Sequence, residues 1–128
     1  MLHQRGVRLI TVECEVGEVR RHGRTLRIRG LAVDAGAEFS WLPRGVLARA
    51  GVPVAKKGLA FVMTDGRIAR RSVGYAVLRA SGFETVDEVV FAEHGDLPVL
   101  GARTLAGFGA VVDVRERRLV AARQGVPA

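Results

Sequence analysis

The clearest hydrophobic pattern in the chain is a strict alternation of apolar and polar residues over residues 10–16. The apolar positions of this alternation are Ile10, Val12, Cys14 and Val16. A period of two is typical of a strand that buries one face, so a strand is predicted here. The alternation resumes over residues 26–29 after a turn signal at residues 21–24, which predicts an antiparallel hairpin. The second strand becomes wholly apolar at residues 31–33, and this predicts burial on both of its faces.

The middle of the chain is predicted to form further antiparallel strands. Residues 59–63 have the composition of a strand, and the Asp-Gly pair within residues 64–67 is typical of a type I′ hairpin turn. A long returning strand is expected to reach Arg79. Residues 81–82 then turn the chain into another strand over residues 83–91.

Two short helices and a last hairpin complete the prediction. Pro43 suits the first turn of a helix that ends at Gly51, and a second helix is expected between Gly101 and Gly109. The last hairpin is expected over residues 111–120. With roughly seven or eight short strands and at most two helices, the chain is predicted to be mostly β.

Length and composition fit a single domain, 1–128, with a core over residues 7–120 and a flexible tail over residues 121–128. Apolar residues make up 48% of the chain and charged residues 26%, as in folded proteins. Cys14 is the single cysteine, so no intramolecular disulfide can form. No apolar stretch has the length of a signal peptide or a membrane span, so we expect a cytoplasmic protein without a membrane partner.

The net charge of +7 raises the question of a nucleic-acid partner. However, the arginines are scattered and often alternate with apolar residues, as in residues 27–29, which is typical of the solvated face of a strand. The aromatic residues are five Phe, one Trp and one Tyr, too few for an obvious base-stacking surface. A basic, nucleic-acid-binding β-barrel is therefore supported by the charge alone.

Candidate chemistry appears at Asp34, which follows the apolar residues 31–33 and precedes the glycine-containing segment 35–37. A second apolar segment, residues 98–101, ends on another glycine. An aspartate followed by a glycine is common in turns, because aspartate accepts local backbone hydrogen bonds and glycine allows positive φ. Taken alone, the Asp34 segment would therefore be interpreted as an ordinary turn. The order and spacing of the two segments along the chain instead point to an enzyme family.

Together the two segments resemble the retroviral-type, retropepsin-like (clan AA) aspartic proteases. The signature of that family is a hydrophobic strand, Asp-Thr/Ser-Gly-Ala and, further on, two apolar residues closed by glycine. Its order of catalytic loop, flap hairpin, strand pair, glycine-closed strand and short helix matches the order of the segments here. The Trp-Leu-Pro of residues 41–43 further resembles small bacterial, single-domain members. The resemblance implies a retropepsin-like half-barrel with a flap hairpin, and it covers nearly the whole chain.

The resemblance also implies site residues. Asp34 would be catalytic, and the other implied positions are the active-site loop Ala35, Gly36 and Ala37, the flap Thr64, Asp65, Gly66 and Arg67, and the substrate-cleft wall Val99, Leu100 and Gly101. The reaction needs two carboxylates that share a proton, and the chain has one such loop, so a homodimer acting on a peptide or protein substrate is expected. No cofactor is implied. No metal site is expected, because His3, His22, His94 and Cys14 lack metal-ligand spacing.

Three features depart from the family pattern. The flap tip, residues 64–67, has one glycine and two charged residues, whereas the flap of viral members is rich in glycine. Ala35 stands where the family has the Thr or Ser that links the two loops across the dimer axis. Ala102 stands where the family has an arginine that braces the loop, although Arg103 follows one place later. Two functions therefore stay open: an active homodimeric aspartic endopeptidase, and an inactive dimer of the same fold that binds peptides or proteins.

Overall fold

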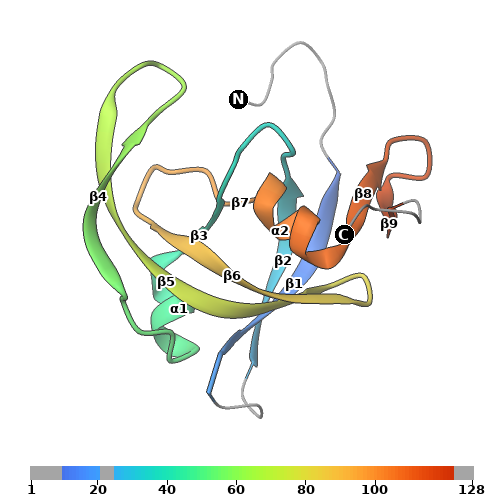
Figure 1. Ribbon diagram of the computed structural model, residues 1–128, viewed down its shortest axis with the longest axis horizontal. Helices are drawn as coiled ribbons and strands as arrows, with labels where there is room; N and C mark the ends of the chain where they lie inside the picture. Colours follow the sequence, from blue (N-terminus) through green and yellow to red (C-terminus); the bar gives the residue numbers. More distant parts are fainter. Residues whose placement is uncertain (1–9, 21–24, 123–128) are drawn as a thin grey trace, which may run out of the picture.

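The computed structural model describes residues 10–20 and 25–122, and it shows a mostly β chain with two short helices, as predicted (Figure 1). In chain order the elements are β1 (Thr11–Glu18), β2 (Thr25–Val33), β3 (Ser40–Pro43), α1 (Arg44–Arg49), β4 (Lys56–Val62), β5 (Ile68–Ala80), β6 (Phe83–Ala92), β7 (Val99–Leu100), α2 (Ala102–Phe108), β8 (Ala110–Asp113) and β9 (Arg118–Ala121). The turn expected at residues 21–24 lies outside the described residues.

Six strands close into a barrel. The strand order of the large sheet is β1-β2-β7-β3-β6-β5-β4, and an additional pairing of β1 with β5 closes the ring. This closure depends on the length of β5, because residues 76–79 pair with β1 while residues 68–73 pair with β4 on the same edge. The β4–β5 hairpin therefore projects beyond the barrel (Figure 1).

The predicted alternation of β1 is confirmed, since Ile10, Val12, Cys14 and Val16 are all buried in the core. In β2 the inward positions change from even to odd numbers between Ile28 and Leu31. A register shift against β1 occurs there, where Gly30 adopts a φ of 66°. Such a bulge adds one residue and turns the following side chains to the other face. Ala32 consequently points outward and is half-buried, so the prediction of burial on both faces is wrong at this residue.

The short strand β7 lies between β2 and β3. It runs parallel to β2 and antiparallel to β3, and β3 in turn runs parallel to β6. The segment that joins β2 to β3, residues 34–39, must therefore pass over the end of β7. This crossing places the candidate catalytic loop against the start of α2.

Both predicted helices are confirmed. In α1, Leu47 is buried and Gly51 follows the helix with a φ of 81°. In α2, Leu105 and Phe108 are buried, and Gly109 ends the helix in the left-handed conformation. That conformation favours glycine, because other residues pay a steric cost there.

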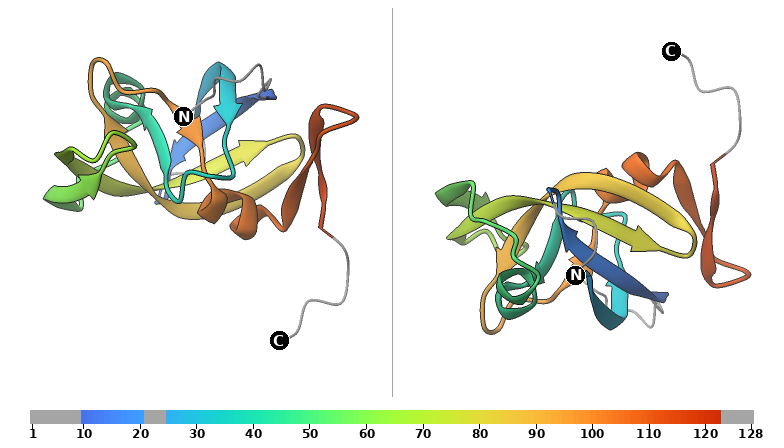
Figure 2. Two further views of the ribbon diagram at one scale, coloured as in Figure 1. Left: turned by 90° about the horizontal axis from the view of Figure 1, so that it is seen from above. Right: turned by 90° about the horizontal axis from the view of Figure 1, so that it is seen from below.

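The last hairpin is also confirmed, as β8 and β9 pair across residues 110–121. It lies at the opposite end of the molecule from the β4–β5 hairpin (Figure 2). The segment expected as a tail begins inside β9 at Ala121, and the Ala122 N–H donates to the Gly109 carbonyl at 2.7 Å. The remainder of the expected tail, residues 123–128, lies outside the described residues.

The turn of the β4–β5 hairpin differs from the predicted type I′. That type needs positive φ at both central residues, whereas Gly66 has a φ of 86° and Asp65 does not have positive φ. The Gly66 N–H donates to the Met63 carbonyl at 2.9 Å, and the Met63 N–H donates to the Arg67 carbonyl at 2.8 Å. These bonds match the three-residue hairpin loop that ends on a left-handed glycine.

A part-buried ion pair holds this hairpin in place. Arg71 of β5 donates from Nε and Nη2 to the two carboxylate oxygens of Asp96, at 2.7 and 2.8 Å. Their side chains are only 17% and 8% exposed. Asp96 also accepts the Glu93 N–H at 2.7 Å. The Arg71 guanidinium holds the pKa of Asp96 below its usual value. The hairpin is thereby tied to the loop that leads into β7.

We expect Asp96→Asn to lower the free energy of unfolding by about 2 kcal/mol, because the part-buried Arg71 guanidinium loses its charged hydrogen-bond partner. Urea denaturation at neutral pH measures the change. Asp65→Asn is the matched control, because Asp65 pairs with Arg67 on the exposed hairpin turn, and it should change stability little. Equal losses in the two variants would contradict a dominant role for the Arg71–Asp96 pair.

The Arg71–Asp96 pair also predicts how the difference in stability between the wild type and Asp96→Asn depends on pH. Because the folded-state pKa of Asp96 lies below the usual value of 3.8, its contribution to stability is present above that value. The contribution is lost as the pH falls through the folded-state pKa. The stabilities of the wild type and Asp96→Asn should therefore approach each other as the pH falls below 3.8, and they should coincide only below the folded-state pKa of Asp96.

Candidate active site in the cleft beside Asp34

Asp34 directly follows β2, and backbone hydrogen bonds set its orientation. Its N–H donates to the Leu100 carbonyl at 2.9 Å, and its carbonyl accepts the Ala37 N–H at 3.1 Å. The Gly36 N–H donates to Asp34 Oδ1 at 2.9 Å. Asp34 is half-buried, whereas Ala35 and Gly36 are exposed. The carboxylate is therefore held by the loop itself, and the tip of the loop is open to solvent.

The rest of the loop is bonded to the start of α2. The Ala102 N–H donates to the Ala37 carbonyl at 2.7 Å, and the Arg103 N–H donates to the Glu38 carbonyl at 3.0 Å. Gly101 lies directly beneath this crossing. A Cβ at position 101 would collide with the carbonyl groups of Phe39 and Ala37. Glycine is thus required here for close approach of two backbone segments.

A buried chain of hydroxyl groups completes the support. The Gly101 N–H donates to Ser40 Oγ at 2.9 Å, and Thr104 Oγ1 donates to Asp87 Oδ2 at 2.8 Å. Ser40 Oγ and Thr104 Oγ1 are themselves hydrogen-bonded. Because the Thr104 proton points to Asp87, the Ser40 hydroxyl must be the donor in that bond. All four groups are hydrogen-bonded, so the network supports the loop and leaves none of these polar groups unpaired.

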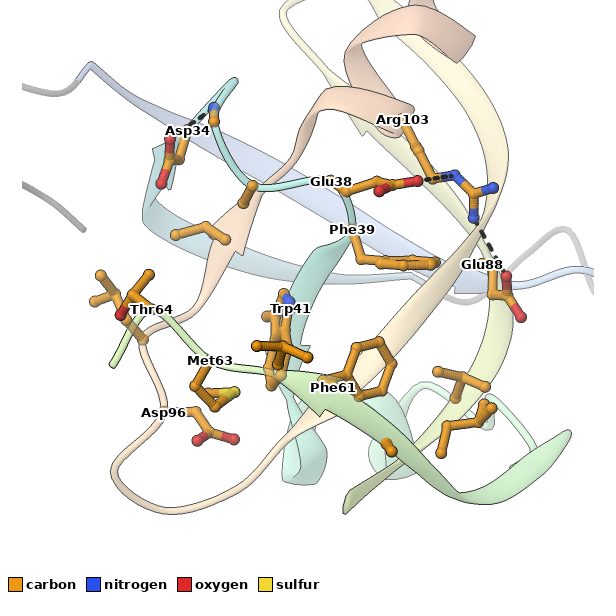
Figure 3. Close-up of a pocket in the computed structure, with 18 of the residues that line it drawn as sticks. Asp34, Glu38, Phe39, Trp41, Phe61, Met63, Thr64, Glu88, Asp96 and Arg103 are labelled. Atoms are coloured by element: carbon orange, nitrogen blue, oxygen red, sulfur yellow. Dashed lines mark hydrogen bonds and ion pairs between the residues drawn. The ribbon is translucent and has the colours of Figure 1, made fainter. Parts of the chain in front are cut away.

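A cleft of about 780 Å³ lies between the loop and the β4–β5 hairpin (Figure 3). Asp34, Gly36, Ala37 and Glu38 line it from the loop. From the hairpin the lining residues are Lys56, Leu59, Ala60, Phe61, Val62, Met63 and Thr64. In Figure 3, Asp34 stands at one end of the cleft and Arg103 and Glu88 stand at the other.

Aromatic rings from both sides meet in the middle of the cleft. Phe61 of β4 contacts Phe39 and Trp41 edge-on, with centroid distances of 5.6 and 5.3 Å. Edge-to-face pairs of this kind are favourable, so the rings help to hold the hairpin against the barrel. They also give the cleft an apolar centre.

Ion pairs occupy the end of the cleft away from Asp34. Glu88 of β6 lies between Lys56 of β4, at 2.9 Å, and Arg103 of α2, at 3.5 Å. Arg103 reaches the loop as well, with its Nε 3.6 Å from a Glu38 carboxylate oxygen and its guanidinium 4.6 Å from the centre of the Phe39 ring. Hydrogen bonding to Glu88 raises the pKa of Lys56. Arg103 therefore braces the loop from the position after Ala102.

The structure brings only some of the predicted site residues into the cleft. Those that line it are Asp34, Gly36, Ala37, Thr64 and Val99. Leu100 and Gly101, expected in the cleft wall, are buried behind the loop and support it instead. Ala35 is exposed on the loop tip, and Asp65, Gly66 and Arg67 form the exposed end of the hairpin, next to Thr64.

Sequence reasoning missed the aromatic residues of the cleft. Phe39 and Trp41 flank the buried Ser40, so the period of two that continues beyond the loop could have placed both on the cleft side. No local signal could have identified Phe61 or Glu88, because their positions depend on the pairing of β4 and β6 with β5.

The chain matches no protein-family model and no curated protein. Over residues 10–20 and 25–122, no group of three or more His, Cys, Asp or Glu side chains could hold a metal ion. Two of the residues considered above as metal ligands, His3 and His22, lie outside the described residues. No helix in the part of the chain that the structure describes is long and apolar enough to cross a membrane.

We expect Gly101→Ala to destabilise the protein by about 2 kcal/mol, because the added methyl group would push the loop off the β7–α2 junction. Urea denaturation measures the loss. Gly45→Ala in α1 is the matched control, since its new methyl group would meet its nearest neighbour, the Arg49 side chain, at an ordinary 3.8 Å. Equal stability of Gly101→Ala and wild type would show that the crossing is looser than the structure indicates.

Proposed function

We propose that the protein is a homodimeric aspartic endopeptidase to which each subunit contributes Asp34. The observation that carries the proposal is that the Asp34 carboxylate and the projecting β4–β5 hairpin line one cleft with an apolar centre. Such a cleft suits an extended peptide, because apolar side chains can pack among the rings. Its main chain can add to the free edge of β4, the last strand of the sheet.

The chemistry follows from a pair of such carboxylates. One accepts a proton from a water molecule, which attacks the carbonyl carbon of the peptide bond. The other, protonated, donates to the carbonyl oxygen, and the leaving nitrogen then takes a proton as the C–N bond breaks. The Gly36 N–H bond to Oδ1 of Asp34 holds each carboxylate in place during these transfers.

A second copy of the chain is needed to complete this site. One subunit has one such loop. Its Asp34 stands at one end of the cleft, and Ala35 and Gly36 of the same loop are exposed. A twofold axis beside the loop would bring two Asp34 side chains together and join two half-clefts. The β4–β5 hairpin of each subunit would then cover the substrate as a flap and exclude water.

The alternative is a dimer that binds peptides in the same cleft without cleaving them. Ala35 favours it, because a methyl group cannot hydrogen-bond to the loop of the other subunit. Under both proposals the protein works in the cytoplasm. Burial raises the pKa of the Cys14 thiol to about 12, so this side chain takes no part in the proposed chemistry.

Peptidase activity should vanish in Asp34→Asn, which keeps the shape of the side chain and removes the titrating carboxylate. The wild-type activity should follow a bell-shaped pH profile on the acidic side of neutrality, because the two carboxylates share one proton. Cleavage of an internally quenched peptide library measures both. Asp113→Asn, on the distant β8–β9 hairpin, is the matched control and should retain activity.

A mixing experiment tests the shared site directly. Adding excess Asp34→Asn protein to the wild type should suppress activity, because mixed dimers hold one carboxylate of the pair. Equal turnover by Asp34→Asn and the wild type would show that another group or a contaminant cleaves the library. A folded dimer that binds peptides but cleaves none between acidic and neutral pH would favour the binding alternative.

Ala35→Thr should raise turnover if the wild-type loop is catalytically competent but weakly tied across the axis. The new hydroxyl would add a hydrogen bond between subunits, which is worth about 1 kcal/mol. We expect tighter dimerisation in sedimentation equilibrium together with a higher kcat. An inactive Ala35→Thr dimer would count against the endopeptidase proposal, whereas activity gained only in this variant would mark the natural protein as the binding form.

A further inference from the structure

The cleft has the opposite charge balance to the rest of the protein. Its lining includes four acidic residues, Asp34, Glu38, Glu88 and Asp96, and two basic residues, Lys56 and Arg103. The whole chain has 13 acidic and 20 basic residues. Acidic side chains are therefore concentrated where a ligand would lie, on a protein that otherwise repels cations.

Glu38 is the acidic residue best placed to meet a ligand outside the Asp34 position. Asp96 is held by Arg71 in the part-buried pair, and Glu88 is only 19% exposed between two cations. The Glu38 side chain is 68% exposed, and its one ion pair among the described residues is the 3.6 Å contact with Arg103. It stands on the loop between Asp34 and Arg103, at the rim of the cleft (Figure 3).

The two cations of the lining are already engaged. Lys56 and Arg103 both pair with Glu88, and the Arg103 guanidinium also packs on the Phe39 ring. An anionic ligand side chain would meet cations that already have carboxylate partners, whereas a cationic one can approach the exposed Glu38 carboxylate, whose contact with Arg103 is long at 3.6 Å. The Arg103–Phe39 contact also demonstrates that a guanidinium fits against the rings of this cleft.

We propose that the cleft selects peptides in which an apolar segment is flanked by Lys or Arg, and that Glu38 determines this selectivity. The inference rests on the proposed function in taking the Asp34 cleft as the peptide site. The apolar segment packs on Trp41 and Phe61, and the flanking cation pairs with the Glu38 carboxylate. Acidic flanks are disfavoured because they are repelled by the Glu38 carboxylate.

Binding to the Asp34→Asn protein tests the inference without hydrolysis. Three fluorescein-labelled peptides share one Leu-Phe centre and carry lysine, serine or glutamate on both sides of it. Fluorescence polarisation at low and high salt gives each Kd. We expect the lysine peptide to bind about fivefold more tightly than the glutamate peptide at low salt, with a smaller ratio at high salt.

Charge variants identify the residue responsible. Glu38→Gln should reduce the ratio of the two affinities, and Glu38→Arg should reverse the preference. Glu116→Arg makes the same change of charge on the exposed turn after β8 and should leave the ratio unchanged. An equal response to Glu116→Arg would overturn the inference, because net charge would then explain the preference. Equal binding of lysine and glutamate peptides, tighter binding of the glutamate peptide, or no binding at all would also overturn it.

Hydrolysis of the same peptides by the wild type separates this inference from the proposed function. Selective binding of the lysine peptide without cleavage would sink the endopeptidase proposal and leave the selectivity of the cleft intact. Cleavage of all three peptides at equal kcat/KM would support the endopeptidase and overturn the role of Glu38.

Discussion

The candidate site depends on one crossing, where the loop after β2 passes over the end of β7. Strand β7 is inserted between β2 and β3, so the chain can enter β3 only by crossing it. Backbone groups of the crossing segment form hydrogen bonds with the β7–α2 junction. The Asp34 N–H donates to the Leu100 carbonyl, and the Arg103 N–H donates to the Glu38 carbonyl. These bonds need close contact, and Gly101 permits it because it has no side chain. Packing around residue 101 thus determines where the Asp34 carboxylate lies.

Features that depend on neighbouring residues could be predicted from the sequence, whereas contacts between distant segments could not. The buried face of β1 and the left-handed Gly109 at the end of α2 follow from patterns a few residues long. The bulge at Gly30 was missed, because a phase change in a strand is set by its partner's register. The Arg71–Asp96 pair was missed for a similar reason, since its members lie 25 residues apart and meet only when β5 and the β6–β7 loop are in place.

The same contrast between local features and long-range contacts applies to the candidate site. Asp34 and Gly36 belong to one short motif, and the Gly36 N–H bond to the carboxylate is the local geometry that such a motif produces. The rest of the cleft lining is instead assembled from elements that are far apart in the sequence. Trp41, Phe61 and Glu88 come from β3, β4 and β6, and their proximity is a product of sheet order. A motif can therefore indicate a reaction type, whereas selectivity is determined by contacts that require the fold.

The absence of a hydroxyl at Ala35 has different consequences for the loop within one subunit and for the contact between subunits in the proposed dimer. Within one subunit the loop is held from beneath, through the Gly101–Ser40–Thr104–Asp87 chain and the Glu38–Arg103 contacts, and none of these bonds involves the side chain of residue 35. The orientation of a single Asp34 is therefore independent of that side chain. In the proposed dimer, what Ala35 would remove is a bond between the loops of the two subunits. The cost would fall on association and on the spacing of the two carboxylates, whereas the loop geometry within each subunit would not change.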